Sequence, residues 1–181
     1  LMRSDDLEFR GEPLTLQVDA LVGNPPWLTW ARLPSAIKSA WRETYVEELD
    51  LLPHSGADAR LGYANDDVSV PFVWVCIDRY LREGGVASFV LKRGLLTGPA
   101  GRLFRQLRVG DRSLALSRIH DLSPIRPFGQ QVGANAAIYT LVADREPAFP
   151  VETTVWESAG AVPSFASHSD MERSLAATET A

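Results

Sequence analysis

The most constraining stretch of this chain covers residues 19–27, Asp-Ala-Leu-Val-Gly-Asn-Pro-Pro-Trp. Residues 18–22 form a short apolar run rich in β-branched side chains, which predicts a buried parallel strand. Gly23 ends this run. A proline fixes its own φ and pushes the residue before it into extended geometry, so Asn24 and Pro25 are both held non-helical. The sequence therefore predicts a stiff turn at the carboxyl end of a strand, where open α/β sheets bind ligands.

This turn presents three groups that suit a flat ligand. They are the side-chain amide of Asn24, the carbonyl of Pro25, which no local N–H easily claims, and the indole of Trp27. Together they can grip a planar base that bears an amino group. A purely structural turn after a strand is the alternative interpretation of the same residues.

Composition bounds the class of protein. The 181 residues, 45% hydrophobic and 23% charged, suffice for one globular domain with a core. No apolar run approaches the roughly 20 residues of a membrane span. The single cysteine, Cys76, excludes an internal disulfide and a Cys-cluster zinc site, so no metal is expected and a reducing cytoplasm fits. A net charge of −5 disfavours binding DNA through charge alone.

Periodicity and helix breakers predict alternating helices and strands after the turn. Helices are expected over 36–49, 68–82 and 100–107, and strands over 86–91, 113–121 and 135–143. Gly84-Gly85 is expected to stop the second helix, which gives half of a right-handed βαβ crossover. The Pro/Gly-rich connection 124–133 is either a loop over a ligand or a wide hairpin turn. Residues 149–151 and 155–156 belong to an extended segment on the sheet or to the entry of another domain.

Two further groups of polar residues have ordinary interpretations. Arg102, Arg105 and Arg108 are spaced by three and either contact phosphates or form a solvated helix face, and the solvated face is favoured. His120 stands beside Asp121, but no serine or cysteine nucleophile motif accompanies them. We therefore do not assign this pair to catalysis.

The motif from Asn24 to Trp27, preceded by Asp-x-Leu-Val-Gly, resembles the Asn-Pro-Pro-aromatic motif of adenine-N6 DNA methyltransferases. Residues 78–90, 98–105 and 121–129, with 150–151 and 155–156, resemble further segments of the large restriction–modification enzymes of the type II/IIG-like kind. The resemblance implies an α/β fold, the second half of a class I (Rossmann-like) S-adenosylmethionine-dependent methyltransferase sheet, strands 4 to 7 with flanking helices. Residues 1–156 would be this partial catalytic domain, and residues 157–181 a disordered tail or the truncated start of a further region.

The same resemblance implies a reaction. A methyl group passes from S-adenosylmethionine to the N6 amino group of an adenine flipped out of double-stranded DNA, in restriction–modification or phage defence. The Asn24 side-chain oxygen and the Pro25 carbonyl accept the amino hydrogens, Pro26 completes the motif, and Trp27 stacks on the base. Fused or separate specificity and nuclease modules are the further partners that this family implies.

Other assignments reach beyond the motif. Asp19 is assigned to the cofactor, and Lys92 and Arg93, at the end of a later strand, to the substrate. Lys92 departs from the proline or small residue expected there. The family holds its methyl donor with a Phe-x-Gly-x-Gly loop after the first strand and an acidic residue after the second strand, and no segment before Asp19 supplies either. We therefore expect those parts upstream, and this chain alone to be inactive.

Two alternatives remain open. Methyl transfer to protein glutamine or to RNA uses the same motif, although those compact enzymes lack the continuation over residues 128–156. A non-catalytic methyltransferase-like fragment or DNA-recognition scaffold is the other, and the acidic charge and the missing half favour it.

Overall fold

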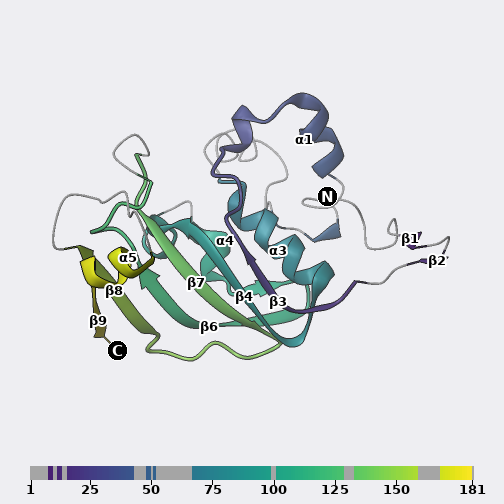
Figure 1. Cartoon of the computed structure of the whole chain (residues 1–181). Coiled ribbons are helices and arrows are strands. Elements are labelled where there is room, and N and C mark those ends of the chain that lie inside the picture. Colours follow the sequence, from purple (N-terminus) through teal and green to yellow (C-terminus); the bar gives the residue numbers. More distant parts are fainter. Residues whose placement is uncertain are drawn as a thin grey trace.

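The computed structural model describes residues 8–9, 12–13, 16–42, 48–49, 51, 67–98, 101–128, 133–158 and 168–180. Its main feature is a mixed seven-stranded sheet with helices packed against it (Figure 1). In spatial order the strands are β3 (Val18–Gly23), β4 (Leu81–Lys92), β7 (Ala136–Ala143), β6 (Arg112–Asp121), β8 (Glu152–Ser158) and β9 (Leu175–Thr180), and β5 (Arg108–Val109) pairs with β6. The remaining elements are the hairpin strands β1 (Glu8–Phe9) and β2 (Glu12–Pro13), and the helices η2 (Trp30–Arg32), α1 (Ser35–Arg42), α3 (Ser69–Tyr80), η5 (Arg93–Leu96), α4 (Arg102–Arg105) and α5 (His168–Ser174).

The strand directions define two opposite ends of the sheet, at which strands begin or finish, and we refer to these ends as edges. β3, β4, β6 and β8 run in one direction, and β7 and β9 run in the other. We call the side where β3, β4 and β6 end, at Gly23, Lys92 and Asp121, the carboxyl edge; the side where β4 and β6 begin is the amino edge. This arrangement is a mixed α/β sheet consistent with a Rossmann-like fold.

The core lies where α3 and α4 pack on the central strands. Trp74 of α3 is fully buried and stacks on Phe104 of α4, with ring centroids 5.6 Å apart. Phe104 in turn meets Tyr139 of β7 at 4.8 Å. Large aromatic side chains bury extensive apolar surface, so this stack fixes both helices against the sheet. Burial also raises the pKa of the Cys76 thiol in α3 to about 11, which keeps it protonated at neutral pH.

The predicted strands around the centre are confirmed. β6 and β7 match the predicted ranges 113–121 and 135–143 to within one residue at their starts. Residues 155–156 lie in β8, which pairs in parallel with β6, so the extended segment on the sheet is the correct alternative. β7 alternates buried and half-buried positions, which explains why its sequence is apolar almost throughout.

The expected burial of the first strand is wrong. β3 has the predicted position and the predicted parallel partner, β4, but Val22 is 84% exposed. Within the described part of the chain β3 pairs only with β4, so it is an edge strand with little cover. An apolar run of this kind is typical of an interior strand, whereas among the described residues no strand covers the outer side of β3.

Gly84 and Gly85 lie inside a strand and do not stop a helix. α3 already ends at Tyr80, and β4 begins at Leu81. Gly84 has φ +66°, and a Cβ on Gly85 would lie 2.7 Å from Leu81 Cδ1. Here the β3–β4 register shifts, which is the behaviour of a β-bulge that only glycine fits easily.

Of the flanking helices, α4 is shorter than predicted, whereas the later part of the helix predicted over 36–49 falls mostly outside the described residues. α1 covers Ser35–Arg42 of the expected 36–49, where residues 43–47 lie outside the described part, and Ile37 is 38% exposed although Trp41 packs on the core. α4 is a single turn because Leu107 adopts φ +48° and β5 follows at once.

The expected disorder after residue 157 is wrong for residues 168–180. These residues form α5 and β9, and β9 pairs antiparallel with β8. Most of β9 is exposed, so it is held beside β8 by backbone hydrogen bonds and not by burial of apolar side chains. Its sequence therefore carries no apolar periodicity from which a strand could be predicted.

Candidate functional site

The Asn-Pro-Pro-Trp motif lies at the carboxyl edge, directly after β3. Asn24 and Pro26 are exposed, Pro25 is buried, and Trp27 is half-buried. A Cβ on Gly23 would lie 3.2 Å from the ring of Phe89 in β4, so glycine lets the chain leave the strand close to its neighbour. The motif thus presents a polar amide to solvent from a turn that is packed on its inner side.

Two contacts fix the indole of Trp27. Its Nε1 donates to the carbonyl oxygen of Val90 in β4 at 3.3 Å, just beyond the last β3–β4 pair. Its ring meets Phe128 edge-to-face, with centroids 5.4 Å apart and planes at 83°. Phe128 is 41% exposed and lies in the connection between β6 and β7. The described part of that connection therefore lies against the motif, and the long-range contact with Phe128 is a site feature that sequence reasoning did not assign.

Lys92 ends β4 at the same edge and forms an ion pair. Its Nζ lies 2.5 Å from Oδ2 of Asp67, whose side chain is 3% exposed. The other carboxylate oxygen, Oδ1, accepts the backbone N–H of Ser69 at the start of α3, at 2.8 Å. Asp67 thus accepts a backbone N–H at the amino end of α3, and its pairing with Lys92 was not predicted from the sequence.

Arg93 is also paired. Its Nε donates to Asp121 Oδ2 at 2.6 Å, and Asp121 Oδ1 accepts the N–H of Ser123 at 2.9 Å. Burial would raise the pKa of Asp121, but the hydrogen bonds from Ser123 and Arg93 outweigh it and hold this pKa below its usual value. The ionised carboxylate of Asp121 therefore connects Arg93, directly after β4, to Ser123 in the connection after β6.

Asp19 is not brought to this group. It lies five residues before Asn24, about 16 Å along an extended strand, and pairs with Arg82 at 2.5 Å toward the amino edge. His120 and Asp121, as strand neighbours, point to opposite faces. His120 Nδ1 accepts the indole N–H of Trp156 at 3.2 Å, so the two residues do not form an acid–base pair.

The three arginines of the predicted helix face have local roles or solvent exposure. Arg105 donates to the carbonyl oxygens of Leu95 and Gly98, at 2.9 and 2.7 Å, and Arg108 donates to Gly110 at 3.0 Å. Arg102 is exposed. The interpretation as a phosphate-binding row is therefore not supported by the contacts of Arg105 and Arg108.

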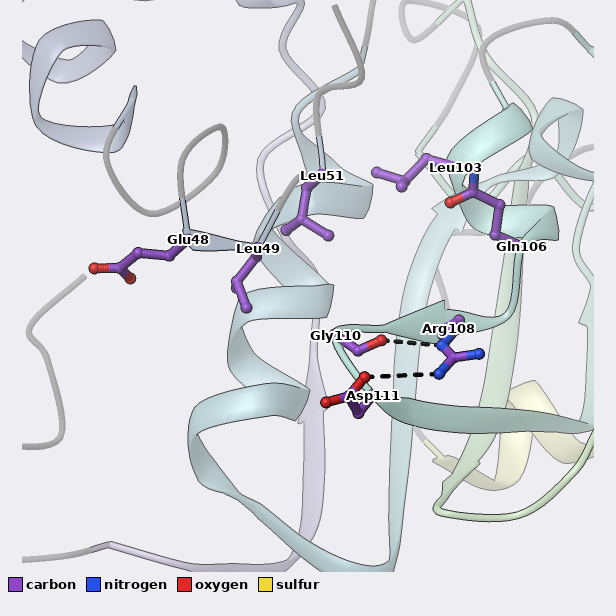
Figure 2. A pocket seen from close by; sticks show the side chains of 8 residues that line it. All are labelled: Glu48, Leu49, Leu51, Leu103, Gln106, Arg108, Gly110 and Asp111. Atoms are coloured by element: carbon purple, nitrogen blue, oxygen red, sulfur yellow. Dashed lines mark hydrogen bonds and ion pairs between the residues drawn. The ribbon is translucent and has the colours of Figure 1, made fainter.

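A cavity of about 480 Å³ lies at the amino edge, away from the motif. Figure 2 shows Leu49, Leu51 and Leu103 directed toward it, with Arg108 bonded to Gly110 and Asp111 on its other side. Gly110 and Asp111 directly precede β6, which places the cavity at the end of the sheet opposite Asn24. Of the residues predicted to contact cofactor or substrate, none lines it.

Within the described ranges, no group of three or more His, Cys, Asp or Glu side chains is placed to hold a metal ion. In the same ranges, no helix has the length and apolar character needed to cross a membrane.

Comparisons with known proteins identify the fold. No protein-family model matches the chain, and neither does any curated protein. A solved structure of a type I restriction–modification system, described for its complex assembly and conformational transition, matches 88% of this chain at 15% identity with a TM-score of 0.52. The type IIG restriction endonuclease BpuSI matches 82% at 19% identity with a TM-score of 0.48. This chain spans 29% and 16% of those chains, respectively. It therefore shares its fold with a part of a larger restriction–modification protein.

Proposed function

We propose that this chain is the base-binding part of an adenine-N6 DNA methyltransferase in a restriction–modification system. One observation carries the proposal. The exposed amide of Asn24 stands beside an anchored Trp27 at the carboxyl edge of a parallel strand pair. The shared fold with a restriction–modification protein supports the cellular context.

The chemistry that these residues perform follows from the target. The lone pair of an adenine amino nitrogen is delocalised into the ring, so this nitrogen is a poor nucleophile. The Asn24 side-chain oxygen and the Pro25 carbonyl oxygen accept its two hydrogens and localise the lone pair. Burial of Pro25 holds its part of the turn rigid. Trp27 contributes a stacking surface that offsets the cost of flipping the base, and correct placement provides the rate increase.

Our proposal does not assign the site of the methyl donor to the described residues. Asp19 pairs with Arg82 far from Asn24, and the described part of the chain contains no Gly-rich loop after a first strand. S-adenosylmethionine, the cofactor that we propose, supplies an electrophilic methyl group when it is bound. Its binding residues belong to the intact protein that contains this chain.

The test is methyl transfer by the intact protein. We expect labelled methyl groups on adenine N6 of double-stranded DNA, and a loss on the order of 100- to 1000-fold in kcat for Asn24→Ala. The exposed Asn135 at the same edge offers a matched control, and Asn135→Ala should retain activity. Because Asn24 is exposed, its replacement should change the free energy of unfolding by less than about 0.5 kcal/mol.

The alternatives are separate outcomes of this experiment. Methylation of RNA or of a glutamine-containing peptide, with DNA unmodified, would replace the DNA substrate but keep the roles of Asn24 and Trp27. Failure of the intact protein to bind S-adenosylmethionine by calorimetry would overturn the enzyme and leave the non-catalytic scaffold, which the net charge of −5 favours as the second candidate.

A further inference from the structure

We propose that the ion pair between Lys92 and Asp67 positions the loop of residues 24–29, which carries the Asn-Pro-Pro-Trp motif. Lys92 is then a positioning residue and does not bind substrate. The importance of the loop rests on the proposed function, whereas the contacts that hold the loop do not depend on it.

Two contacts connect the loop to its neighbours. On one side, the indole N–H of Trp27 donates to Val90 O near the end of β4. On the other side, Leu28 O accepts the N–H of Val68 at 2.9 Å, and Thr29 pairs with Asp67 in an isolated antiparallel bridge. The loop is thus held between the end of β4 and the segment that begins α3.

The ion pair joins these two supports to each other. Asp67 belongs to the segment bound by Leu28 and Thr29, and Lys92 stands two residues beyond Val90 in β4. The loop, the start of α3 and the end of β4 therefore form a closed triangle of contacts. Without the ion pair, the start of α3 can shift relative to β4, and the two loop contacts no longer define one position.

Burial shows that the Lys92 ammonium is committed to this partner. The Asp67 side chain is 3% exposed and that of Lys92 is 31% exposed. If Lys92 turned to a DNA phosphate, it would leave a buried carboxylate without its cation, which is strongly unfavourable. The pair also gives a physical account of Lys92, which stands where a proline or small residue was expected, because neither of those side chains could pair with the buried carboxylate of Asp67.

Hydrogen exchange measured by NMR on the whole chain tests the tether without any activity. The reporters are the Val68 backbone N–H and the Trp27 indole N–H, which make the two loop contacts. In Asp67→Asn, the amide oxygen still accepts the Ser69 N–H, so we expect the fold to persist and both reporters to exchange roughly tenfold faster. Lys92→Met should act likewise, and Lys92→Arg should restore slow exchange.

A matched control removes an ion pair elsewhere. Arg118→Met breaks the exposed pair with Glu152, at 2.5 Å, and should leave both reporters unchanged. Unchanged exchange in Asp67→Asn would overturn the proposal, even if Lys92→Met failed to fold.

A second measurement separates positioning from phosphate binding in the intact protein. If Lys92 positions the loop, Lys92→Met should lower kcat about tenfold and leave unchanged both KM for DNA and the dependence of DNA affinity on salt. If Lys92 instead contacts a phosphate, the slope of log affinity against log salt should fall by about one, and this result would overturn the proposal. An intact protein without methylation activity would refute the proposed function and leave the exchange result to decide on the tether.

Discussion

Both edges of the sheet contain ion pairs between a basic side chain and a carboxylate, but these pairs stabilise different parts of the structure. At the amino edge, Arg112 binds Asp144 through Nε and a terminal nitrogen, at 3.0 and 2.7 Å, and also donates to the carbonyl oxygens of Ile77 and Asp78 at the end of α3. At the carboxyl edge, the pairs of Lys92 and Arg93 connect loops around an exposed amide. At the amino edge the ion pair stabilises the end of α3. At the carboxyl edge the ion pairs lie around a turn whose Asn24 amide faces solvent.

The pKa values of the carboxylates at the two edges follow from these contacts. The hydrogen bond from Arg112 holds the pKa of Asp144 below its usual value, with little opposition from burial. Burial opposes the lowering at Asp121, where the hydrogen bonds from Ser123 and Arg93 prevail. The cavity lies at the amino edge, so the cavity and the Asn-Pro-Pro-Trp turn are at opposite ends of the sheet. Our proposal places the function at the turn, on the basis of its exposed amide and anchored indole, and not at the cavity.

The largest effect on stability should come from the amino edge. Arg112→Met removes the donors for a carboxylate and for the carbonyl oxygens that end α3, so we expect about 3 kcal/mol less free energy of unfolding in urea titrations. Arg108→Met, which loses contacts only to Gly110 and Asp111 on the surface, should change this value by less than about 0.5 kcal/mol. Equal decreases in the free energy of unfolding for Arg112→Met and Arg108→Met would show that Arg112 contributes no more to stability than a surface arginine does.

A smaller effect is expected at the carboxyl edge. Trp27→Phe keeps an aromatic ring but leaves Val90 O without the indole donor, so we expect a loss of about 1 kcal/mol in the free energy of unfolding. Trp27→Ala also removes the stacking surface and should reduce methyl transfer by the intact protein about 10- to 100-fold. If Trp27→Ala retained full activity, the anchored indole would be structural only, as Arg112 is.

The smallest effect is expected at the contact between His120 of β6 and Trp156 of β8. Burial, with the charge of Arg118, lowers the pKa of His120 below its usual value, and neutral His120 Nδ1 accepts the Trp156 N–H. The unfolded chain therefore takes up the proton first as pH falls through about 6.5. The free energy of unfolding should decrease from pH 7 toward pH 5, and less so in His120→Gln, which keeps an acceptor for Trp156. Identical pH profiles of the two proteins would show that this histidine does not contribute.

Sequence reasoning located the central strands and the motif because local patterns define them. The apolar alternation of β6 and β7 and the two prolines after Asn24 act within a few residues. It misplaced the role of Gly84 and Gly85, since glycine marks both a helix end and a strand bulge, and only the register with β3 decides between them. It missed Asp67 with Lys92 and Trp27 with Phe128, because pairs far apart in sequence leave no periodic signal. The pairing of Asp19 with Arg82 was not predicted for the same reason.

The strand order has a consequence for how the molecule is assembled during synthesis. β4 and β6 are made before β7, yet β7 lies between them and pairs with both. Until Ala143 has left the ribosome, the two earlier strands have no native partner along their facing sides. Contacts of such sequence separation form late, because the intervening loop must be closed first. A chain that stopped before residue 136 would leave the facing sides of β4 and β6 open, and open strand edges favour pairing with other molecules. Complete synthesis of β7 is thus the step that commits the nascent chain to its own sheet.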